Sequence, residues 1–84
     1  MTSAPRVLTV VERQVSANDR AAFLATVSAR QQVAEQVRAH VWLFEHTDEP
    51  GRFMEFTEAA DAPAVATVHD GHMPAPLWRE VRGD

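Results

Sequence analysis

Four histidines are the side chains in this sequence best suited to acid–base or metal chemistry. His40 and His46 are six residues apart in an expected strand, which at ~3.3 Å per residue separates them by about 20 Å and excludes a shared ion. His69 and His72 are three residues apart, but Gly71 interrupts the helix that would align them, and the chain has no cysteine. We therefore expect no metal site and no cofactor. Histidine remains as a proton acceptor near neutral pH.

Other common catalytic patterns are absent from the sequence. No G-x-S-x-G turn is present, and Ser28 falls in the middle of an expected helix. The three glycines are isolated, so no glycine-rich phosphate loop exists. The sequence gives no basis for a serine hydrolase or a nucleotide-phosphate site.

The stretch His40–Glu58 carries most of the aromatic residues and predicts a β-hairpin. Two apolar runs, HVWLFEH and RFMEFTE, flank the connector Thr-Asp-Glu-Pro-Gly, which is typical of a turn. If His46 lies opposite Arg52, alternation of side chains places the aromatic residues of both strands on one face. That register predicts a continuous patch made of Trp42, Phe44, Met54 and Phe56.

A strand and a helix are expected before the hairpin. The β-branched run from Arg6 to Val15 predicts a first strand, and its middle is apolar on both faces, which is unlike an edge strand facing water. Ser16 or Asn18 can cap a helix that runs to about Arg38. Its apolar face is expected to comprise Phe23, Val27, Ala34 and Val37.

Arg30 falls in the middle of this apolar helix face and has two interpretations. Its aliphatic stem can pack while the guanidinium reaches water, with or without a bend in the helix. Alternatively, the guanidinium is directed at an acidic ligand, because a buried arginine without a partner is rare. The sequence leaves both interpretations open.

A second helix and a last strand are expected after the hairpin. Asp61 is a candidate N-cap, Pro63 suits the first turn, and Gly71 suits the C′ position. Two prolines in the segment 72–76 exclude helix there. The alternation in LWREVR predicts a last strand over Leu77–Arg82.

The order strand, helix, strand, strand, helix, strand predicts a fold class. In a single domain of 84 residues, this order is typical of an α+β ferredoxin-like βαββαβ fold, with an antiparallel four-stranded sheet and both helices on one face. The other face would expose a tryptophan and two phenylalanines, a larger apolar patch than soluble monomers usually carry. We therefore expect a symmetric homodimer that pairs through this sheet face.

Charge and hydropathy exclude two classes of partner. The net charge is −4 and the eight basic residues are scattered arginines, so no basic face for nucleic acid is expected. No run approaches the ~20 apolar residues that span a bilayer, and the first ten residues resemble no signal peptide. We expect no membrane partner and a cytoplasmic location.

The hairpin also resembles a known family. The run from Trp42 to Phe56, WLFEHTDEPGRFMEF, is similar to antibiotic biosynthesis monooxygenase-like (ABM-like) domains of the dimeric α+β barrel superfamily. Such domains typically show an aromatic strand, an acidic-Pro-Gly-Arg-Phe turn, a glutamate in the next strand and a histidine in the following short helix, where this chain has His69. The resemblance implies a cofactor-independent monooxygenase acting on an aromatic or polyketide-like compound. Haem degradation is not expected, because Ala59 and Ala60 stand where that branch has a tryptophan.

These observations predict a small-molecule cavity with His69 as the catalytic base. A mostly apolar cavity with a few polar groups is the usual form of a ligand site, and a histidine there can deprotonate a phenolic substrate. The alternative is a non-catalytic dimerisation or regulatory module, in which the aromatic residues serve assembly and His69 lies on the surface. The expected ligand-binding residues are Trp42, Phe44, His46, Met54, Glu55, Phe56 and Arg30.

Overall fold

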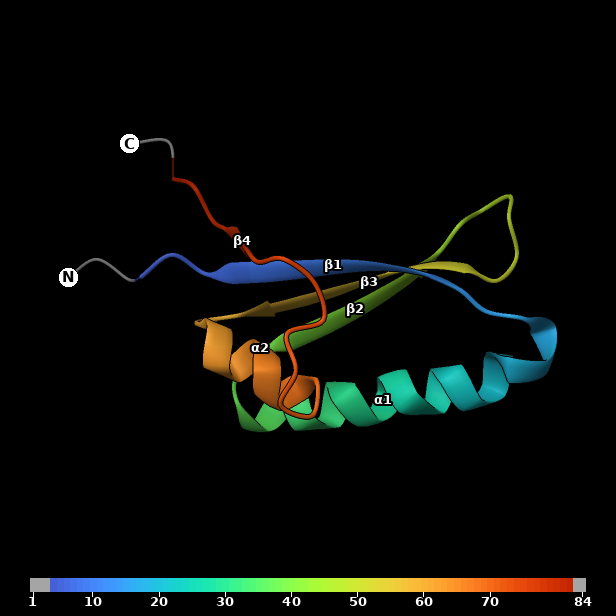
Figure 1. The fold of residues 1–84 in the computed structure, drawn as a ribbon, viewed down its shortest axis with the longest axis horizontal. Helices are drawn as coiled ribbons and strands as arrows, with labels where there is room; N and C mark the ends of the chain where they lie inside the picture. The colour runs from blue at the N-terminus through green and yellow to red at the C-terminus, as the bar shows by residue number, and fades with distance from the viewer. Residues whose placement is uncertain (1–3, 83–84) are drawn as a thin grey trace.

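The computed structural model describes residues 4–82, which form a small α+β fold compatible with the ferredoxin-like prediction. A four-stranded antiparallel sheet packs against two helices (Figure 1). A short 3₁₀ turn, Ala17–Asp19, leads directly into the first helix. In chain order the elements are β1 (Val7–Gln14), α1 (Arg20–Gln36), β2 (His40–Glu45), β3 (Arg52–Ala59), α2 (Ala62–Val68) and β4 (Trp78–Arg79).

The sheet has the strand order β2-β3-β1-β4, with all neighbours antiparallel. Strand β1 is therefore interior, as its apolar middle suggested. In the hairpin, Trp42 pairs with Phe56 and Phe44 with Met54, which confirms the expected register. Because side chains alternate along a strand, this register decides which residues share a face.

Both helices cover one face of the sheet and leave the other open (Figure 1). On the covered face, β3 contributes Phe53, Glu55, Thr57 and Ala59, all buried. The apolar core forms where α1 and α2 meet this face. Its buried members are Val27, Ala34, Ala39, Val41, Ala59, Val65 and Val68.

The two helices end in the same way, and this corrects one expectation. After α2, Asp70 adopts the left-handed conformation at the C′ position (φ 57°), and Gly71 follows at C″, donating its N–H to the Ala66 carbonyl at 2.8 Å. After α1, Arg38 takes the same conformation, and Ala39 donates to Ala34 at 2.8 Å. Gly71 is thus one position beyond the expected C′ site.

The start of α1 and the last strand also differ from expectation. Neither Ser16 nor Asn18 caps α1, which begins at Arg20 after the 3₁₀ turn, and the Ser16 hydroxyl donates to the Asp19 side chain at 3.0 Å instead. Asp61 caps α2 as expected, accepting the Ala64 N–H at 2.9 Å. The expected strand over Leu77–Arg82 contracts to two residues, because only Val7 and Leu8 lie opposite it on β1. No helix among residues 4–82 is both long and apolar enough to cross a membrane.

The hairpin turn depends on Gly51. Its φ is +85°, and a Cβ there would lie 2.3 Å from the Val15 carbonyl oxygen. The Gly51 N–H donates to the Glu45 carboxylate at 2.9 Å, and its carbonyl accepts from Val15 at 2.8 Å. This glycine therefore holds the turn against the end of β1.

Candidate functional site

The residues expected to form one cavity lie on opposite faces of the sheet. Trp42, Phe44, Met54 and Phe56 occupy the open face, whereas Glu55 lies on the face covered by the helices, together with Arg30 and His69. Adjacent strand residues such as Glu55 and Phe56 must point in opposite directions. The expectation that these residues line one cavity is therefore wrong, because the sheet lies between them.

The open face carries the aromatic patch. Phe44 and Phe56 are in edge-to-face contact with ring centroids 5.7 Å apart, and His40 stacks on Trp42 at 5.5 Å. Trp78 of β4 lies in register with Leu8 and is 64% exposed, while Phe44 is 59% exposed. A groove of about 520 Å³ is lined by Trp42, Phe44, Phe56 and Trp78, with the Arg6–Glu58 ion pair among its other lining groups.

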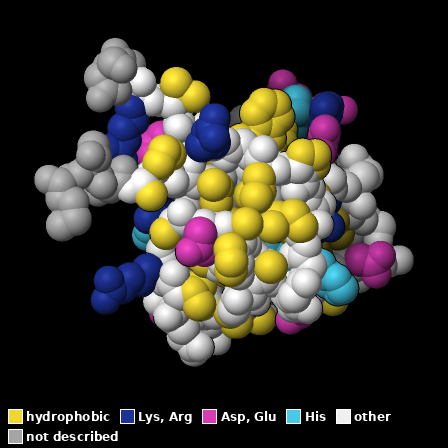
Figure 2. All heavy atoms as spheres, turned by 60° about the vertical axis from the view of Figure 1, so that its left-hand side comes forward, with side chains coloured by type: hydrophobic (Ala, Val, Ile, Leu, Met, Phe, Trp, Pro, Cys, Tyr) yellow, Lys and Arg dark blue, Asp and Glu magenta, His cyan; other side chains and the backbone are white. Residues whose placement is uncertain are grey.

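Apolar surface is prominent on the outside of the molecule. In the view of Figure 2, hydrophobic side chains cover the middle of the visible surface and the charged ones lie mostly near its outline. The exposed large hydrophobic residues are Leu24, Trp42, Phe44, Met54, Met73, Leu77, Trp78 and Val81. The aromatic residues among them are Trp42, Phe44 and Trp78, which lie on the open face of the sheet. The open face is therefore the main concentration of exposed aromatic surface.

The covered face holds a buried charged cluster around Glu55. Its side chain is fully buried, and Arg30 donates to it from Nε at 2.7 Å and from Nη2 at 2.8 Å. Arg13 adds a third hydrogen bond from Nε at 3.2 Å. Burial alone would raise the pKa of Glu55, but the hydrogen bonds and charges of the two arginines outweigh it and lower the pKa. Glu55 is therefore an ionised carboxylate that accepts three hydrogen bonds from the two arginines.

The cluster shows how the side chain of Arg30 is accommodated. Its guanidinium is neither placed in water nor left free for an acidic ligand. It makes a two-pronged ion pair with a carboxylate of the same chain, and only 16% of its side chain is exposed. The helix face around it packs as predicted, with Val27 and Ala34 buried.

His69 lies beside this cluster at the end of α2 and is only 8% exposed. Its Nε2 is 2.7 Å from the hydroxyl oxygen of Thr57, and its Nδ1 makes no hydrogen bond to any residue in the described range 4–82. Burial lowers the pKa of His69; the Glu55 carboxylate opposes that shift, and Arg30 and Arg13 add to it. A pKa below the ordinary value leaves the imidazole mostly neutral at pH 7. In the tautomer whose Nε2–H donates to the Thr57 hydroxyl, Nδ1 carries the lone pair and can accept a proton.

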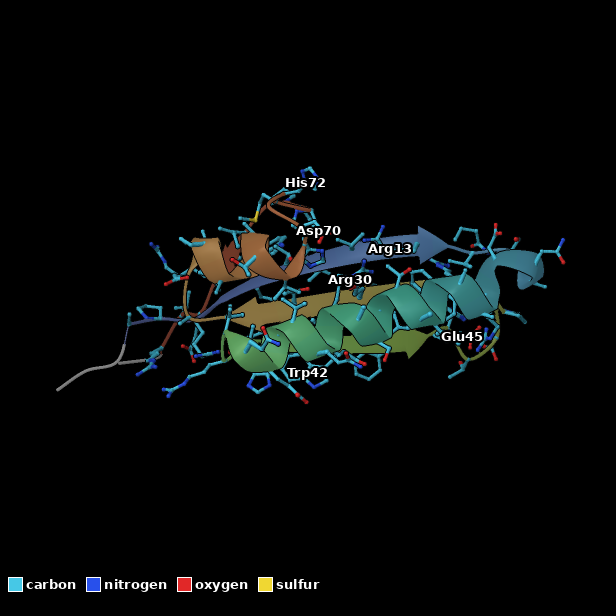
Figure 3. All side chains as sticks on the ribbon, turned by 90° about the horizontal axis from the view of Figure 1, so that it is seen from below. Arg13, Arg30, Trp42, Glu45, Asp70 and His72 are labelled. Atoms are coloured by element: carbon cyan, nitrogen blue, oxygen red, sulfur yellow. The ribbon has the colours of Figure 1, made fainter. Side chains whose placement is uncertain are left out.

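A hollow of about 310 Å³ opens beside His69. Figure 3 shows Arg13, Arg30, Asp70 and His72 gathered around the end of α2, while Trp42 lies away from them along β2. No phenylalanine or tryptophan lines it. The lining residues are Val11, Arg13, Arg30, His69, Asp70, His72 and Pro74.

His46, another expected site residue, lies apart at the hairpin turn. Its Nδ1 accepts the Asp48 N–H at 3.0 Å, and its Nε2 lies 3.3 Å from the Glu49 carboxylate. These local contacts hold the turn. Among residues 4–82, no three His, Cys, Asp or Glu side chains are grouped so that they could hold a metal ion.

Sequence reasoning missed Arg13, Thr57 and the loop that carries Asp70 and His72. Arg13 is separated from Glu55 by more than forty residues along the chain, and only the β1–β3 register brings them together. A signal was present, because Val7, Thr9, Val11 and Arg13 alternate onto one face of the first strand. Without the register of β1 on β3, that face could not be matched to Glu55.

Comparison of the chain with protein-family models, with curated proteins and with solved structures found no match. No family is shown. The ABM-like resemblance of the hairpin therefore stays a prediction.

Proposed function

We propose that this protein is a homodimeric small-molecule-binding protein whose ligand occupies the hollow beside α2. The observation that carries the proposal is His69: a buried imidazole with a lowered pKa, whose Nδ1 has no hydrogen bond to residues 4–82, next to two guanidinium groups. A perturbed titratable group in a cleft is a common mark of a functional site. A surface histidine, the alternative that the sequence left open, would not have this burial.

The chemistry of the hollow suits a ligand with an acidic hydroxyl or an acidic C–H group. Neutral His69 accepts the proton, and the positive charges of Arg13 and Arg30 stabilise the anion that forms. The electron-rich ligand anion can then reduce dioxygen directly. One oxygen atom becomes a carbonyl oxygen on a ligand carbon, and the other leaves as water with two hydrogens that the ligand gives up, so that the ligand supplies all the electrons. This is the cofactor-independent monooxygenation that the ABM-like resemblance implies.

The aromatic patch on the open face supports the homodimeric part of the proposal. A patch of Trp42, Phe44, Met54 and Phe56, with Trp78 beside it, resembles the aromatic-rich centre of a protein–protein interface. A second copy placed face to face would bury all of these side chains at once. The hollow lies on the helix side, so this pairing leaves it open to solvent.

A thermal-shift screen tests the ligand part of the proposal. Quinones, flavonoids and polyketide-like aromatic compounds are added to the wild-type protein, and a ligand is expected to raise the melting temperature. Oxygen uptake is then followed with each compound that binds. His69→Asn is expected to bind these compounds without consuming oxygen, and His46→Asn, at the hairpin turn away from the hollow, is the matched control. A panel with no binder would contradict the proposal.

A second function is favoured by the separation of the two faces. None of the aromatic residues lines the hollow, and the exposed ones lie on the open sheet face. A non-catalytic dimerisation module would need only that face. It would give a stable dimer, no thermal shift with any aromatic compound, and no effect of His69→Asn beyond stability.

A further inference from the structure

We infer that the hollow beside α2 selects ligands that carry a single carboxylate, which Arg13 binds. This inference rests on the proposed function, since it names the class of ligand for the same hollow. It goes further by assigning Arg13, a residue outside the sequence-predicted site, as the group that recognises the ligand's charge.

Arg13 has terminal nitrogens that are not used within the described chain. Its Nε donates to Glu55 at 3.2 Å, but its two terminal nitrogens make no hydrogen bond to any described residue. About a third of its side chain is exposed, and it lines the hollow. Arg6, Arg20, Arg30 and Arg52, by contrast, each donate at least one terminal nitrogen to a partner. The terminal fork of Arg13 is available to a ligand.

Glu55 is shared between two arginines and bonds more strongly to Arg30 than to Arg13. Its two oxygens accept three hydrogen bonds, two of them from Arg30. Arg30 holds the carboxylate in a fixed orientation, and the carboxylate in turn fixes Nε of Arg13. The planar fork beyond that Nε is therefore oriented in advance, and such a fork matches the geometry of a carboxylate.

The charges around the hollow limit the charge of the ligand. At the hollow the guanidinium groups of Arg13 and Arg30 balance the carboxylates of Glu55 and Asp70, and His69 is neutral. A monoanion adds one uncompensated charge, while a dianion adds two and also faces Asp70 at the rim. A carboxylate thus fits this hollow better than a phosphate ester.

The apolar part of the wall completes the ligand class. Val11 and Pro74 line the hollow beside the charged groups. A volume of about 310 Å³ accommodates one or two rings rather than a large polyketide. The ligand inferred is a small ring carboxylic acid, bound with its carboxylate at Arg13 and its ring against the apolar wall.

Four two-ring probes test this inference: 2-naphthoate, its neutral amide 2-naphthamide, 2-naphthol and 2-naphthyl phosphate. Affinities come from calorimetry, and backbone amide shifts in NMR spectra report whether a probe binds beside Val11, Arg13 and Asp70. With wild-type protein, 2-naphthoate is expected to bind about tenfold tighter than the amide or the naphthol, the gain typical of a charged hydrogen bond. It should also bind tighter than the phosphate.

Arg13→Gln should remove the preference for the carboxylate over the amide, and Arg38→Gln, an exposed arginine elsewhere, should keep it. Equal binding of naphthoate and naphthamide by wild-type protein would overturn the inference while leaving the proposed function standing. So would tighter binding of the phosphate. If none of the four probes shifts the amides of the hollow, both proposals fail for this ligand class. If Arg13→Gln does not fold, the affinities of wild-type protein for 2-naphthoate and 2-naphthamide still show whether the hollow prefers a carboxylate.

Discussion

Two threonines on the covered face differ in one respect that matters for stability. Thr9 and Thr57 are paired in the β1–β3 register and both are buried. The Thr57 hydroxyl bonds to His69, whereas the Thr9 hydroxyl has no hydrogen-bond partner among the described residues. A buried hydroxyl without a partner is costly, because it has lost its hydrogen bonds to water.

Thr9→Val should therefore stabilise the protein. Valine has nearly the same shape and favours strands, so the change removes the unsatisfied hydroxyl without opening a cavity. We expect the free energy of unfolding to rise by about 1 kcal/mol. Urea denaturation measures it. Thr57→Val is the matched control and should destabilise, since it leaves His69 Nε2 without its partner; a destabilised Thr9→Val protein would show that the hydroxyl is satisfied in solution.

His69 should make stability depend on pH in one direction. Its pKa in the folded protein is below its ordinary value of about 6.5. As pH falls through that value, the unfolded chain takes up a proton at this position before the folded protein does. Stability conferred at neutral pH is therefore lost on the acid side, between the unfolded pKa and the lower folded pKa.

The measurement is the free energy of unfolding at pH 7.5 and pH 5.5 for wild type and His69→Asn. The variant should lose less stability over this interval, because one of the groups that titrates differently in the two states is gone. His72→Asn removes an exposed histidine and serves as the control. An identical pH slope for wild type and His69→Asn would contradict the lowered pKa.

At the scale of elements, Glu55 joins β3 to α1 and β1 through its two arginines. Moving two charges out of water into the protein costs free energy, and their mutual attraction can offset this cost only in part. Removing one partner leaves the other charge buried without compensation, which is strongly destabilising. The contribution of the pair is thus best measured by removing each member and then both.

Arg30→Met should destabilise the protein by about 3 kcal/mol, because Glu55 keeps only the weaker hydrogen bond from Arg13. Glu55→Leu should also destabilise, since Arg30 is then buried without a carboxylate. The double variant should be less destabilised than the sum of the two single changes. Urea denaturation of the four proteins gives the coupling, and strict additivity would show that the pair contributes nothing.

The elements and the hairpin register could be predicted from the sequence, while the charged cluster could not. Local signals determine the hairpin: alternation, the Pro-Gly connector and the aromatic positions all lie within His40–Glu58. The partnership of Arg13, Arg30 and Glu55 depends on contacts between residues far apart in the chain. Arg30 stood out because it interrupts an apolar helix face, but nothing local identified Glu55 as its partner.

The candidate site was only partly predictable for the same reason. His69 was singled out, and the structure places it in a hollow. The aromatic residues grouped with it in the sequence argument lie across the sheet, because the alternation of β3 sends Glu55 and Phe56 to opposite faces. Which face the helices cover is a tertiary choice that no single strand reveals.

At the scale of the whole molecule, the sheet separates two surfaces with different chemistry. The helix side carries the polar hollow with His69, and the open side carries the aromatic patch. If the open side pairs with a second copy, assembly and ligand binding use different surfaces of one subunit. The two properties should then be separable by mutation.

Phe44→Glu should convert the proposed dimer to a monomer without unfolding it. Phe44 is mostly exposed within one subunit, so a charge there costs the isolated fold little, but two opposed glutamates in a face-to-face dimer would be buried without partners. Sedimentation equilibrium measures the mass, and circular dichroism checks the fold. Leu24→Glu, at an exposed apolar residue on α1, is the matched control and should remain dimeric. A wild-type protein that is monomeric at micromolar concentration would refute pairing through this face.

The Phe44→Glu monomer should still bind 2-naphthoate, because the hollow lies on the other side of the sheet.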